Sequence, residues 1–275
     1  MPKISPLAAV DPRAQLADDV EVGPFCVVGP SVTLGSGNRL LSHVVITGNT
    51  SIGRENVFHP NCVIGGVPQD LKYRGEDARL EIGNRNVIRE AVTIHIGTEN
   101  GSKINGGGVT RLGDDNLLMV NCHIGHDAQF GNQCVLANNV MIAGHVVCGD
   151  HVAMMGAVGV HHLVSIGDFA YIAAEARVTH DVPPFVKVSD GDQIRGLNSV
   201  GLQRAGFKGA DIAAIDDAAR RMFFGRDKEK SFSQVLAEFD TMNGINPYVK
   251  FLIEFLRRRD LGKHGRYLES LRCGN

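Results

Sequence analysis

The stretch LGDDNLLMVNCHIGHDAQFGNQCVLANNVMIAGHVVC (residues 112–148) places an apolar side chain at every sixth position. The same interval extends outward to Ile4 and to Val178, and 26 of its 30 positions are apolar. The exceptions lie in two polar stretches and are Asp70, Glu76, Asn100 and Gly106. An α-helix repeats every 3.6 residues and a simple strand every two, so a period of six predicts short extended segments separated by corners. Repeats this short indicate a parallel β-helix, in which one apolar residue of each unit points to the axis.

A second inward position precedes each sixth residue by two places and is usually small and apolar, as at Val20, Val32 and Val140. Three units of six residues, 18 in all, would form one triangular coil, so residues 18 apart would stack on one face. Neighbouring coils then lie about 4.8 Å apart along the axis. Side chains therefore fill the predicted prism, and the coil spacing shows which polar residues come together.

The composition allows a large core with one appendage, since the chain has 275 residues, 43% hydrophobic content and a net charge of −2. Its first residues begin the repeat directly, so we expect no signal peptide, and no run of 18 apolar residues predicts a membrane span. Five cysteines at inward positions, without a CxxC pair, indicate small buried hydrophobes, no metal site and a reducing cytoplasmic location. They are Cys26, Cys62, Cys122, Cys134 and Cys148.

Charge is unevenly distributed along the chain. From Arg195 onward there are 15 Lys and Arg against 10 Asp and Glu, which leaves 13 against 20 in the preceding part. A basic C-terminal part is compatible with an acidic partner or with an ordinary solvated face. Nucleic acid is not expected as a partner, because basic and acidic residues are interspersed and no aromatic stacking cluster accompanies them.

Two polar inserts, near 66–80 and 97–110, interrupt the repeat. Loops on a rigid scaffold often carry binding groups, and Gly106, Gly107 and Gly108 are candidates for a phosphate contact. Because two prolines cannot continue a paired strand, the repeat is expected to end at 181–184. We therefore predict a β-helix domain over 1–190 and a helical C-terminal domain over 191–275. Its helices are expected at 198–205, 210–224, 232–242, 248–259 and 267–271.

A candidate catalytic group follows from the coil spacing. His126 and Gly144 are 18 residues apart, so they would lie on adjacent coils. A base at His126, oriented by Asp127, can take a proton from a substrate hydroxyl while the Gly144 N–H stabilises the oxyanion of an acyl intermediate. On spacing alone, a structural or a metal-binding role for His126 stays open.

The coil spacing also predicts where other histidines lie. His162 lies two coils from His126, about 9.6 Å away, too far for the two to share a metal within one chain. His123 and His145 occupy other phases of the repeat and are expected to face different directions. The chain has no serine in a GxSxG elbow and no exposed cysteine nucleophile is expected, so direct attack by a substrate oxygen is favoured over a covalent enzyme intermediate.

Several segments carry a family resemblance. They are QDLKY (69–73), IREAVTIHIGT (88–98), DNLLMVNCHIGHD (115–127), LANNVMIAGHV (136–146), GVHH (159–162) and DVPPF (181–185). Together they resemble the UDP-N-acetylglucosamine O-acyltransferases, hexapeptide-repeat enzymes that begin lipid A synthesis. The likeness covers nearly the whole chain, including NSVGLQRAGF (198–207).

The resemblance implies a mainly β fold, a left-handed parallel β-helix followed by an α-helical C-terminal domain, in a homotrimer with active sites between neighbouring prisms. It implies transfer of an (R)-3-hydroxyacyl chain from acyl carrier protein to the 3-OH of UDP-N-acetylglucosamine, without a further cofactor. His126 would be the general base, Asp127 its partner and the Gly144 amide the oxyanion donor. The substrate-binding positions would be Asp70, Lys72, His95, His123, His145, His161, His162, Ala174, Asn198 and Arg204.

This chain departs from the family pattern at a few positions. His162 replaces the usual Gln, and Val200 and Ala205 stand where some relatives carry charged residues, which leaves open a 3-hydroxy or a 3-amino sugar as acceptor. Ala174 occupies the position that measures acyl length, where a methyl group is expected to favour a shorter chain than Gly would. Two other readings are a γ-type carbonic anhydrase with zinc, and a scaffold or acetyl-CoA-dependent transferase.

Overall fold

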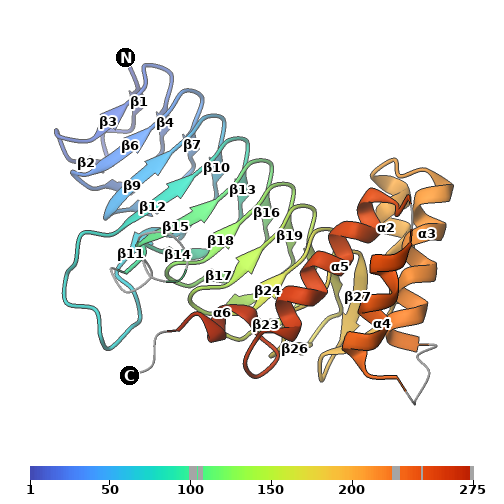
Figure 1. The fold of residues 1–275 in the computed structure, drawn as a ribbon. Coiled ribbons are helices and arrows are strands. Elements are labelled where there is room, and N and C mark those ends of the chain that lie inside the picture. The colour runs from blue at the N-terminus through green and yellow to red at the C-terminus, as the bar shows by residue number, and fades with distance from the viewer. Residues whose placement is uncertain (99–103, 105–107, 225–229, 243, 273–275) are drawn as a thin grey trace.

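The computed structural model describes residues 1–98, 104, 108–224, 230–242 and 244–272. Most of the chain is a β-helix of short strands, which stack in parallel along one axis (Figure 1). The first sheet contains β1 (Lys3–Ile4), β4 (Glu21–Val22), β7 (Arg39–Leu40), β10 (Val57–Phe58), β13 (Val87–Ile88), β16 (Leu117–Leu118), β19 (Val135–Leu136), β22 (Ala153–Met154), β25 (Tyr171–Ile172), β27 (Val186–Ser189) and β28 (Gln193–Leu197).

Two further sheets complete the prism. The second contains β2 (Ala9–Val10), β5 (Val27–Val28), β8 (Val45–Ile46), β11 (Val63–Gly66), β14 (Thr93–His95), β17 (His123–Ile124), β20 (Met141–Ile142), β23 (Gly159–Val160) and β26 (Arg177–Val178). The third contains β3 (Gln15–Leu16), β6 (Val32–Leu34), β9 (Asn49–Ile52), β12 (Arg79–Ile82), β15 (Val109–Leu112), β18 (Gln129–Phe130), β21 (Val147–Cys148) and β24 (Ser165–Ile166).

The strand register shows how the inserts fit into the prism. In a regular coil the paired residues are 18 apart, as for Glu21 and Arg39. Across the inserts they are 30 apart, as for Val57 with Val87 and Thr93 with His123. Each insert therefore adds 12 residues to one coil and leaves the register of the neighbouring coils unchanged.

The axis of the β-helix is filled as predicted. Large apolar side chains such as Phe58, Ile94 and Leu118 have no solvent exposure. The five cysteines at inward positions are buried and are not in disulfides. Interdigitated apolar side chains along the whole axis account for the stability of a fold with such short strands.

A ladder of buried asparagines runs along one corner of the prism. Each Oδ1 atom accepts hydrogen bonds from both the backbone N–H and the side-chain amide of the next asparagine, at 2.9–3.0 Å, from Asn38 through Asn56 and Asn86 to Asn116. The amide of Asn86 also donates to the carbonyl of Gly113. The ladder thus supplies buried corner backbone with partners, as buried polar groups require.

The end of the β-helix differs from the prediction in one respect. Val182 still bridges to Ile166, and β27 still pairs in parallel with β25, so the sheet continues beyond 181–184. Pro183 and Pro184 are tolerated because they lie at a corner and not within a strand. The sheet ends with β28, which pairs with β27 in antiparallel orientation.

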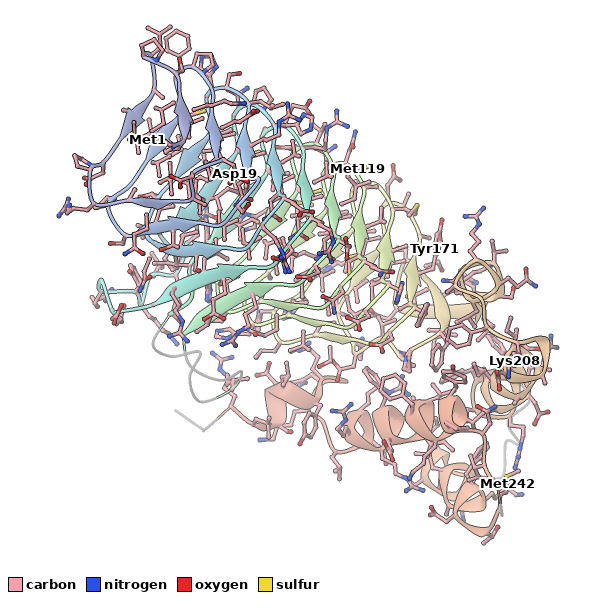
Figure 2. The ribbon with its side chains drawn as sticks, turned by 90° about the horizontal axis from the view of Figure 1, so that it is seen from above. Met1, Asp19, Met119, Tyr171, Lys208 and Met242 are labelled. Carbon is pink, nitrogen blue, oxygen red and sulfur yellow. The ribbon has the colours of Figure 1, made fainter. Side chains whose placement is uncertain are left out.

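Helices follow the last strand at the predicted places. They are α2 (Ser199–Arg204), α3 (Gly209–Ala219), the π-helical η2 (Arg220–Phe224), α4 (Phe232–Glu238), the 3-10 turn η3 (Phe239–Thr241), α5 (Pro247–Asp260) and α6 (Tyr267–Ser270). Residues such as Leu202, Ile215 and Leu252 form a second core with Phe185. Figure 2 follows the chain from Met1 along the β-helix to the helices near Lys208. The domain boundary at 190 stays a prediction.

The C-terminal segment returns to the β-helix and is held there by Asp181. Its Oδ1 accepts from the N–H of Ser165 and its Oδ2 from the N–H of Tyr267, both at 2.7 Å, and its own N–H donates to Gly265. The segment lies along the last coils (Figure 1). Among the described residues, no helix has the length and apolar character needed to cross a bilayer.

Candidate functional site

The candidate base lies at the corner between the second and third sheets. His126 and Asp127 follow β17 and precede β18, one coil before His145. Asp127 and His145 both have left-handed backbone conformations, with φ of 60° and 61°. The N–H of His145 donates to the carbonyl of His126 at 2.9 Å. Two side chains of adjacent coils are thereby held beside one another at this corner.

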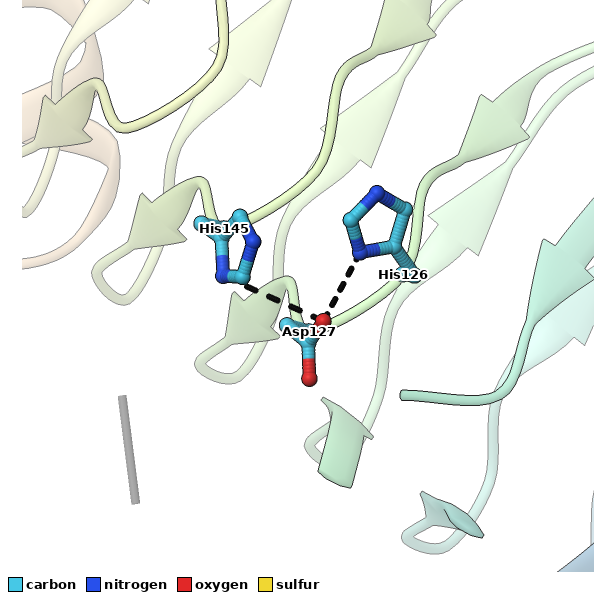
Figure 3. A group of neighbouring side chains, drawn as sticks. All are labelled: His126, Asp127 and His145. Carbon is cyan, nitrogen blue, oxygen red and sulfur yellow. Dashed lines mark hydrogen bonds and ion pairs between the residues drawn. The ribbon is translucent and has the colours of Figure 1, made fainter. Parts of the chain in front are cut away.

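His126 and Asp127 form a hydrogen-bonded dyad. The Nδ1 atom of His126 lies 2.7 Å from Oδ2 of Asp127 (Figure 3). The Asp127 side chain is 1% exposed and that of His126 is 15% exposed. A carboxylate at Nδ1 favours the tautomer that carries its proton there and leaves a lone pair on Nε2. The geometry is therefore that of an oriented general base with an accessible edge.

The buried carboxylate of Asp127 has further donors. Its Oδ1 accepts from the N–H of Thr98 at 2.9 Å, and its Oδ2 accepts from the Thr98 hydroxyl at 2.7 Å. Burial by itself would raise the pKa of Asp127, but the hydrogen bonds from His126 and Thr98 outweigh it and lower the pKa below its ordinary value. Asp127 therefore stays ionised at neutral pH.

Gly144 faces the ring of His126 from the next coil. A Cβ atom built on Gly144 would lie 2.6 Å from Nε2 and 2.7 Å from Cε1 of that ring. A side chain at this position would have to displace the ring of His126. The close approach brings a peptide backbone next to the reactive edge of His126, which is the proximity predicted from the spacing of 18 residues.

A groove of about 660 Å³ opens on the second sheet beside His126. Its walls combine histidines with small and apolar groups: Gln69, His95, His123, His126, Met141, Gly144, Ala157, Gly159, His161, Glu175 and Arg177 are among the lining residues. His123 therefore shares a cleft with His126, and the expectation that it faces elsewhere is wrong. The reason is that His123 is an outward residue of β17, three positions before His126 on the same coil, so both side chains border the groove.

His95 and His123 form the inner part of the groove. Their rings meet edge to face with centroids 4.7 Å apart, and Nδ1 of His123 lies 2.8 Å from the hydroxyl of Thr93. Burial, with a contribution from the rings of His123 and His126, lowers the pKa of His95 to about 4. Burial, with His126 nearby, also lowers the pKa of His123. Both are neutral at pH 7 and can accept or donate hydrogen bonds to a polar substrate.

His145 also lies against the dyad. Its ring stands perpendicular to that of His126, with centroids 5.0 Å apart, and its Nδ1 is 3.9 Å from Oδ2 of Asp127 (Figure 3). The expectation that it faces another direction is therefore wrong, because its left-handed corner conformation turns it toward the preceding coil. Burial lowers the pKa of His145, although the carboxylate of Asp127 opposes the shift.

Donor atoms of His126, Asp127 and His145 lie within 4.8 Å of one another, which is close enough to consider a metal ion. However, Oδ2 of Asp127 already receives hydrogen bonds at 2.7 Å from both His126 and Thr98. These contacts are those of a dyad whose carboxylate is occupied by donors. They favour acid–base chemistry over metal ligation at this corner.

Two predicted residues of the first insert lie outside the lining of the groove. The Asp70 carboxylate accepts from the N–H of Lys72 at 2.9 Å, within a turn of the insert, and Lys72 is exposed. Asp70 is nevertheless close enough to His145 to affect its pKa, in the upward direction. In the second insert, Gly106 and Gly107 lie outside the described residues.

Four other predicted residues are not brought into the groove of this single chain. His162 stacks on His161 and faces Glu269, at 3.8 Å, whereas His161 lines the groove. Ala174 is exposed at the corner after β25. Asn198 caps α2 by accepting from the N–H of Gly201, and Arg204 is exposed in the last turn of that helix. The substrate-binding roles of these four residues stay predictions.

Thr98 and Thr110 were missed by the sequence reasoning. Thr98 ends the segment IREAVTIHIGT, and Thr110 stands at the inward position two residues before Leu112, where most coils have a small apolar residue. That departure is a signal for Thr110. Thr98 gives no comparable signal, because its contact with Asp127 depends on how the insert leaves the coil.

Comparisons with known proteins agree with this geometry. A family model described as UDP-N-acetylglucosamine O-acyltransferase, domain 2, matches residues 181–264. The solved UDP-N-acetylglucosamine O-acyltransferase of Moraxella catarrhalis is 40% identical with a TM-score of 0.86, covering 92% of this chain and 96% of that chain. LpxA from Acinetobacter baumannii is 37% identical with a TM-score of 0.85, covering 93% and 96%. The chain belongs to the UDP-N-acetylglucosamine O-acyltransferase family.

As a member of this family, the chain is an acyltransferase. A UDP-N-acetylglucosamine acyltransferase from Bacteroides fragilis, 32% identical with a TM-score of 0.86, covers 92% of this chain and 96% of its own. The predicted fold, a left-handed parallel β-helix followed by a helical C-terminal region, is confirmed. Likeness over the whole length argues against the carbonic anhydrase reading, which would not account for the C-terminal helices.

Proposed function

We propose that this acyltransferase moves an (R)-3-hydroxyacyl group from acyl carrier protein to the 3-hydroxyl of UDP-N-acetylglucosamine, the first step of lipid A synthesis. The observation that carries the proposal is the His126–Asp127 dyad, with Nδ1 to Oδ2 at 2.7 Å, at the mouth of a groove beside Gly144. A groove lined by histidines, by a few other polar side chains and by apolar groups suits a sugar hydroxyl together with an acyl chain.

In the proposed mechanism, Nε2 of His126 removes the proton from the sugar hydroxyl as its oxygen attacks the thioester carbonyl. The negative charge moves to the carbonyl oxygen, where the N–H of Gly144 stabilises it. The intermediate then expels the thiolate as the carbon–sulfur bond breaks. The proton on His126 passes to the thiolate, so the products are the ester and a free thiol. Asp127 stabilises the imidazolium and keeps the ring oriented.

The cysteines support direct attack by the sugar. Burial raises the pKa of Cys62 to about 12 and that of Cys122 to about 11. Such thiols are poor nucleophiles because the thiolate is the reactive form. None of the described cysteines lines the groove, so we assign no acyl-enzyme intermediate to this site.

The acyl carrier protein and the cytoplasmic location are parts of the same proposal. The sequence from Arg195 onward carries 15 Lys and Arg against 10 Asp and Glu. Arg258, at the end of α5, is exposed and can contact an acidic partner, whereas the neighbouring Arg257 is paired with Asp240. The free cysteines suit a reducing compartment, which is where we place the reaction.

A homotrimer is supported by the outer faces of the prism. The outward side chains of the first sheet include Val57, Val87, Leu117 and Val135, and those of the second include Val27, Val45, Val63 and Met141. The third sheet instead presents Gln15, Thr33, Ser51, Glu81 and Arg111. The first sheet presents Lys3, Glu21 and Arg39 in its first coils, so its apolar part is the middle of the face. This part and the apolar part of the second sheet fit a cyclic assembly, in which each protomer contacts two neighbours through different surfaces.

The trimer also gives a place to the predicted residues that lie outside the groove. Asn198 and Arg204 belong to α2 and its cap, beyond the last coil. We expect them, with Asp70 and Lys72, to complete a nucleotide site shared between protomers. The turnover assay described below, run with 3-hydroxy and with 3-amino sugar nucleotides, distinguishes the two acceptors.

The test is turnover of (R)-3-hydroxyacyl-acyl carrier protein with UDP-N-acetylglucosamine. Wild type is expected to form the 3-O-acyl sugar, and His126→Ala is expected to lose about 10²–10⁴-fold in kcat with the assembly intact. His151→Ala is the matched control, since this ring stacks on Phe169 away from the groove. Unchanged turnover by His126→Ala would exclude the assigned base. Turnover with acetyl-CoA and none with acyl carrier protein would replace the donor.

A further inference from the structure

Two threonines at the base of the second insert hold the Asp127 unit. Thr98, at the start of the insert, contacts both carboxylate oxygens, through its N–H to Oδ1 at 2.9 Å and its hydroxyl to Oδ2 at 2.7 Å. Thr110, at the end of the insert, accepts from the backbone N–H of Asp127 at 2.8 Å. The two ends of one insert therefore meet at the partner of His126.

These contacts are fully inside the protein. Thr98 is 2% exposed, Thr110 has no exposure and Asp127 is 1% exposed. A buried carboxylate needs hydrogen-bond donors, because it has lost its water. Here Thr98 fixes the plane of the Asp127 carboxylate with two hydrogen bonds, and a second lone pair of Oδ2 faces Nδ1 of His126.

The hydroxyl of Thr110 is not needed to build the coil. The same inward position of the third sheet is Val32, Thr50 and Leu80 in the preceding coils, which pair in register with it. Ala128 and Val146 occupy it in the next coils by the same spacing. An apolar residue thus satisfies the packing, and the hydroxyl at 110 accepts from the backbone N–H of Asp127. The positive φ of Asp127 is shared by the corner residues of other coils, such as Asn61 and His145, so the hydroxyl is an addition to the ordinary corner.

The base of the insert is closed tightly enough to position both threonines. The N–H of Arg79 donates to the carbonyl of Gly108, and the N–H of Gly97 donates to the carbonyl of Arg79, each at 3.1 Å. A Cβ atom on Gly97 would lie 2.2 Å from the carbonyl carbon and oxygen of Gly108. The two ends of the insert therefore cross in contact, anchored on β12.

We propose that Thr98 and Thr110 are positioning residues for acyl transfer: Thr98 orients the Asp127 carboxylate toward Nδ1 of His126, and Thr110 holds the backbone that carries it. The inference rests on the proposed function, since it acts through the proposed base. It assigns to the insert a structural part in catalysis besides any contact with substrate. A carboxylate that turns away would leave His126 free to rotate and to change tautomer.

The experiment compares Thr98→Val, Thr98→Ser and Thr110→Val with wild type by steady-state kinetics over a range of pH. Thr98→Val keeps the shape and the backbone N–H contact but removes the hydroxyl. We expect kcat to fall roughly 10- to 100-fold with little change in KM, because a misplaced base affects the chemical step. Thr98→Ser should restore kcat to within a few fold. Thr110→Val should reduce kcat in the same way.

A shift in the pH profile separates positioning from a general loss of structure. With one donor fewer on Oδ2, the carboxylate holds the His126 proton more strongly, so the acidic limb of kcat should move to higher pH in Thr98→Val and return in Thr98→Ser. Thr50→Val is the matched control, because Thr50 is as buried on β9 as Thr98 is and its hydroxyl donates to the carbonyl of Thr47, away from Asp127. If Thr98→Val does not fold, Thr98→Ala takes its place.

The outcomes separate this inference from the proposed function. If His126→Ala loses turnover while Thr98→Val matches Thr50→Val in kcat and in its pH limb, the positioning role is overturned and the base stands. If His126→Ala keeps full turnover, the assigned base itself fails. A loss in Thr98→Val that serine does not rescue would also overturn the proposal, since the hydroxyl would not be its cause.

Discussion

The backbone of Gly144 lies so close to His126 that a Cβ atom there would be 2.6 Å from Nε2 of the ring. The ring and the peptide belong to adjacent coils, and the corner between them leaves no room for a methyl group. In the proposed mechanism this closeness lets His126 act on the sugar hydroxyl while the Gly144 N–H acts on the carbonyl oxygen of the thioester that the hydroxyl attacks.

Gly144→Ala is therefore expected to displace the ring of His126 and to lower kcat by about 100-fold, since a misplacement of about 1 Å has effects of that size. The fold should persist, because the clash involves one side chain and not the core. Gly156→Ala is the control, as its Cβ would meet nothing closer than 3.5 Å. Kinetics with circular dichroism check both variants; full activity of Gly144→Ala would contradict the contact.

Asn86→Ala should destabilise the β-helix more than an ordinary core truncation. It removes the acceptor for the N–H and side-chain amide of Asn116 and the donor to Gly113, all buried. Unpaired buried polar groups cost about 1–3 kcal/mol each. Cys134→Ala, at the end of the same ladder, removes a small buried side chain and only the weak hydrogen bonds that a thiol donates, as to the carbonyl of Gly149. Thermal melting of the two variants is the measurement, and equal melting temperatures would show that the ladder adds nothing.

Asp181 should make stability depend on pH. Burial raises its pKa to about 6 from an ordinary value near 3.8, although the N–H groups of Tyr267 and Ser165 oppose the shift. The folded protein then binds this proton more tightly than the unfolded chain, so the contribution to stability is present at pH 4 and is lost as the pH rises through 6.

The measurement is the melting temperature of Asp181→Asn and of wild type between pH 4 and pH 7. The melting temperature of Asp181→Asn minus that of wild type is expected to increase with pH. The corresponding change in the free energy of unfolding is on the order of 2 kcal/mol. Asp18→Asn, at an exposed position, gives the background dependence. A constant difference over this range would mean that Asp181 does not titrate there.

Leu117→Glu should dissociate the proposed trimer. Leu117 points outward from β16 on one of the two apolar faces, and a carboxylate buried there without a partner costs several kcal/mol. Thr33→Glu, on the polar third sheet, should leave the assembly intact. Size-exclusion chromatography with light scattering distinguishes the states. A monomeric wild type, or a trimeric Leu117→Glu, would contradict the proposal that the apolar outer faces form the trimer interface.

The sequence period was sufficient to predict the β-helix because each coil repeats the same local demand. An apolar residue every six positions leaves few alternatives, and the stacking of His126 against Gly144 follows from a separation of one coil. The ring of His145 was misjudged because the period gives the stacking of the coils but not the direction in which a corner side chain points. His123 was misjudged because an outward strand residue and a corner residue three positions later can border one groove, which a count of repeat phases does not show.

Thr98 illustrates what local patterns cannot reveal. Its contact with Asp127 joins residues 29 positions apart across an insert, and it exists because the insert ends cross at Gly97 and Gly108. Neither the propensity of threonine nor its place in a motif encodes that crossing. Thr110 was more accessible to reasoning, because a hydroxyl at an otherwise apolar position needs an explanation.

The way the two inserts join the prism has an evolutionary consequence. Each departs and returns at a corner while the strands before and after it keep their pairing partners in order. Mutations that lengthen, shorten or recompose the inserts between their anchored ends, such as Thr98 and Thr110 of the second, would leave the strand register of the β-helix unchanged. Selection can thus change which substrates the insert residues contact while the coils that carry His126 and Asp127 stay the same.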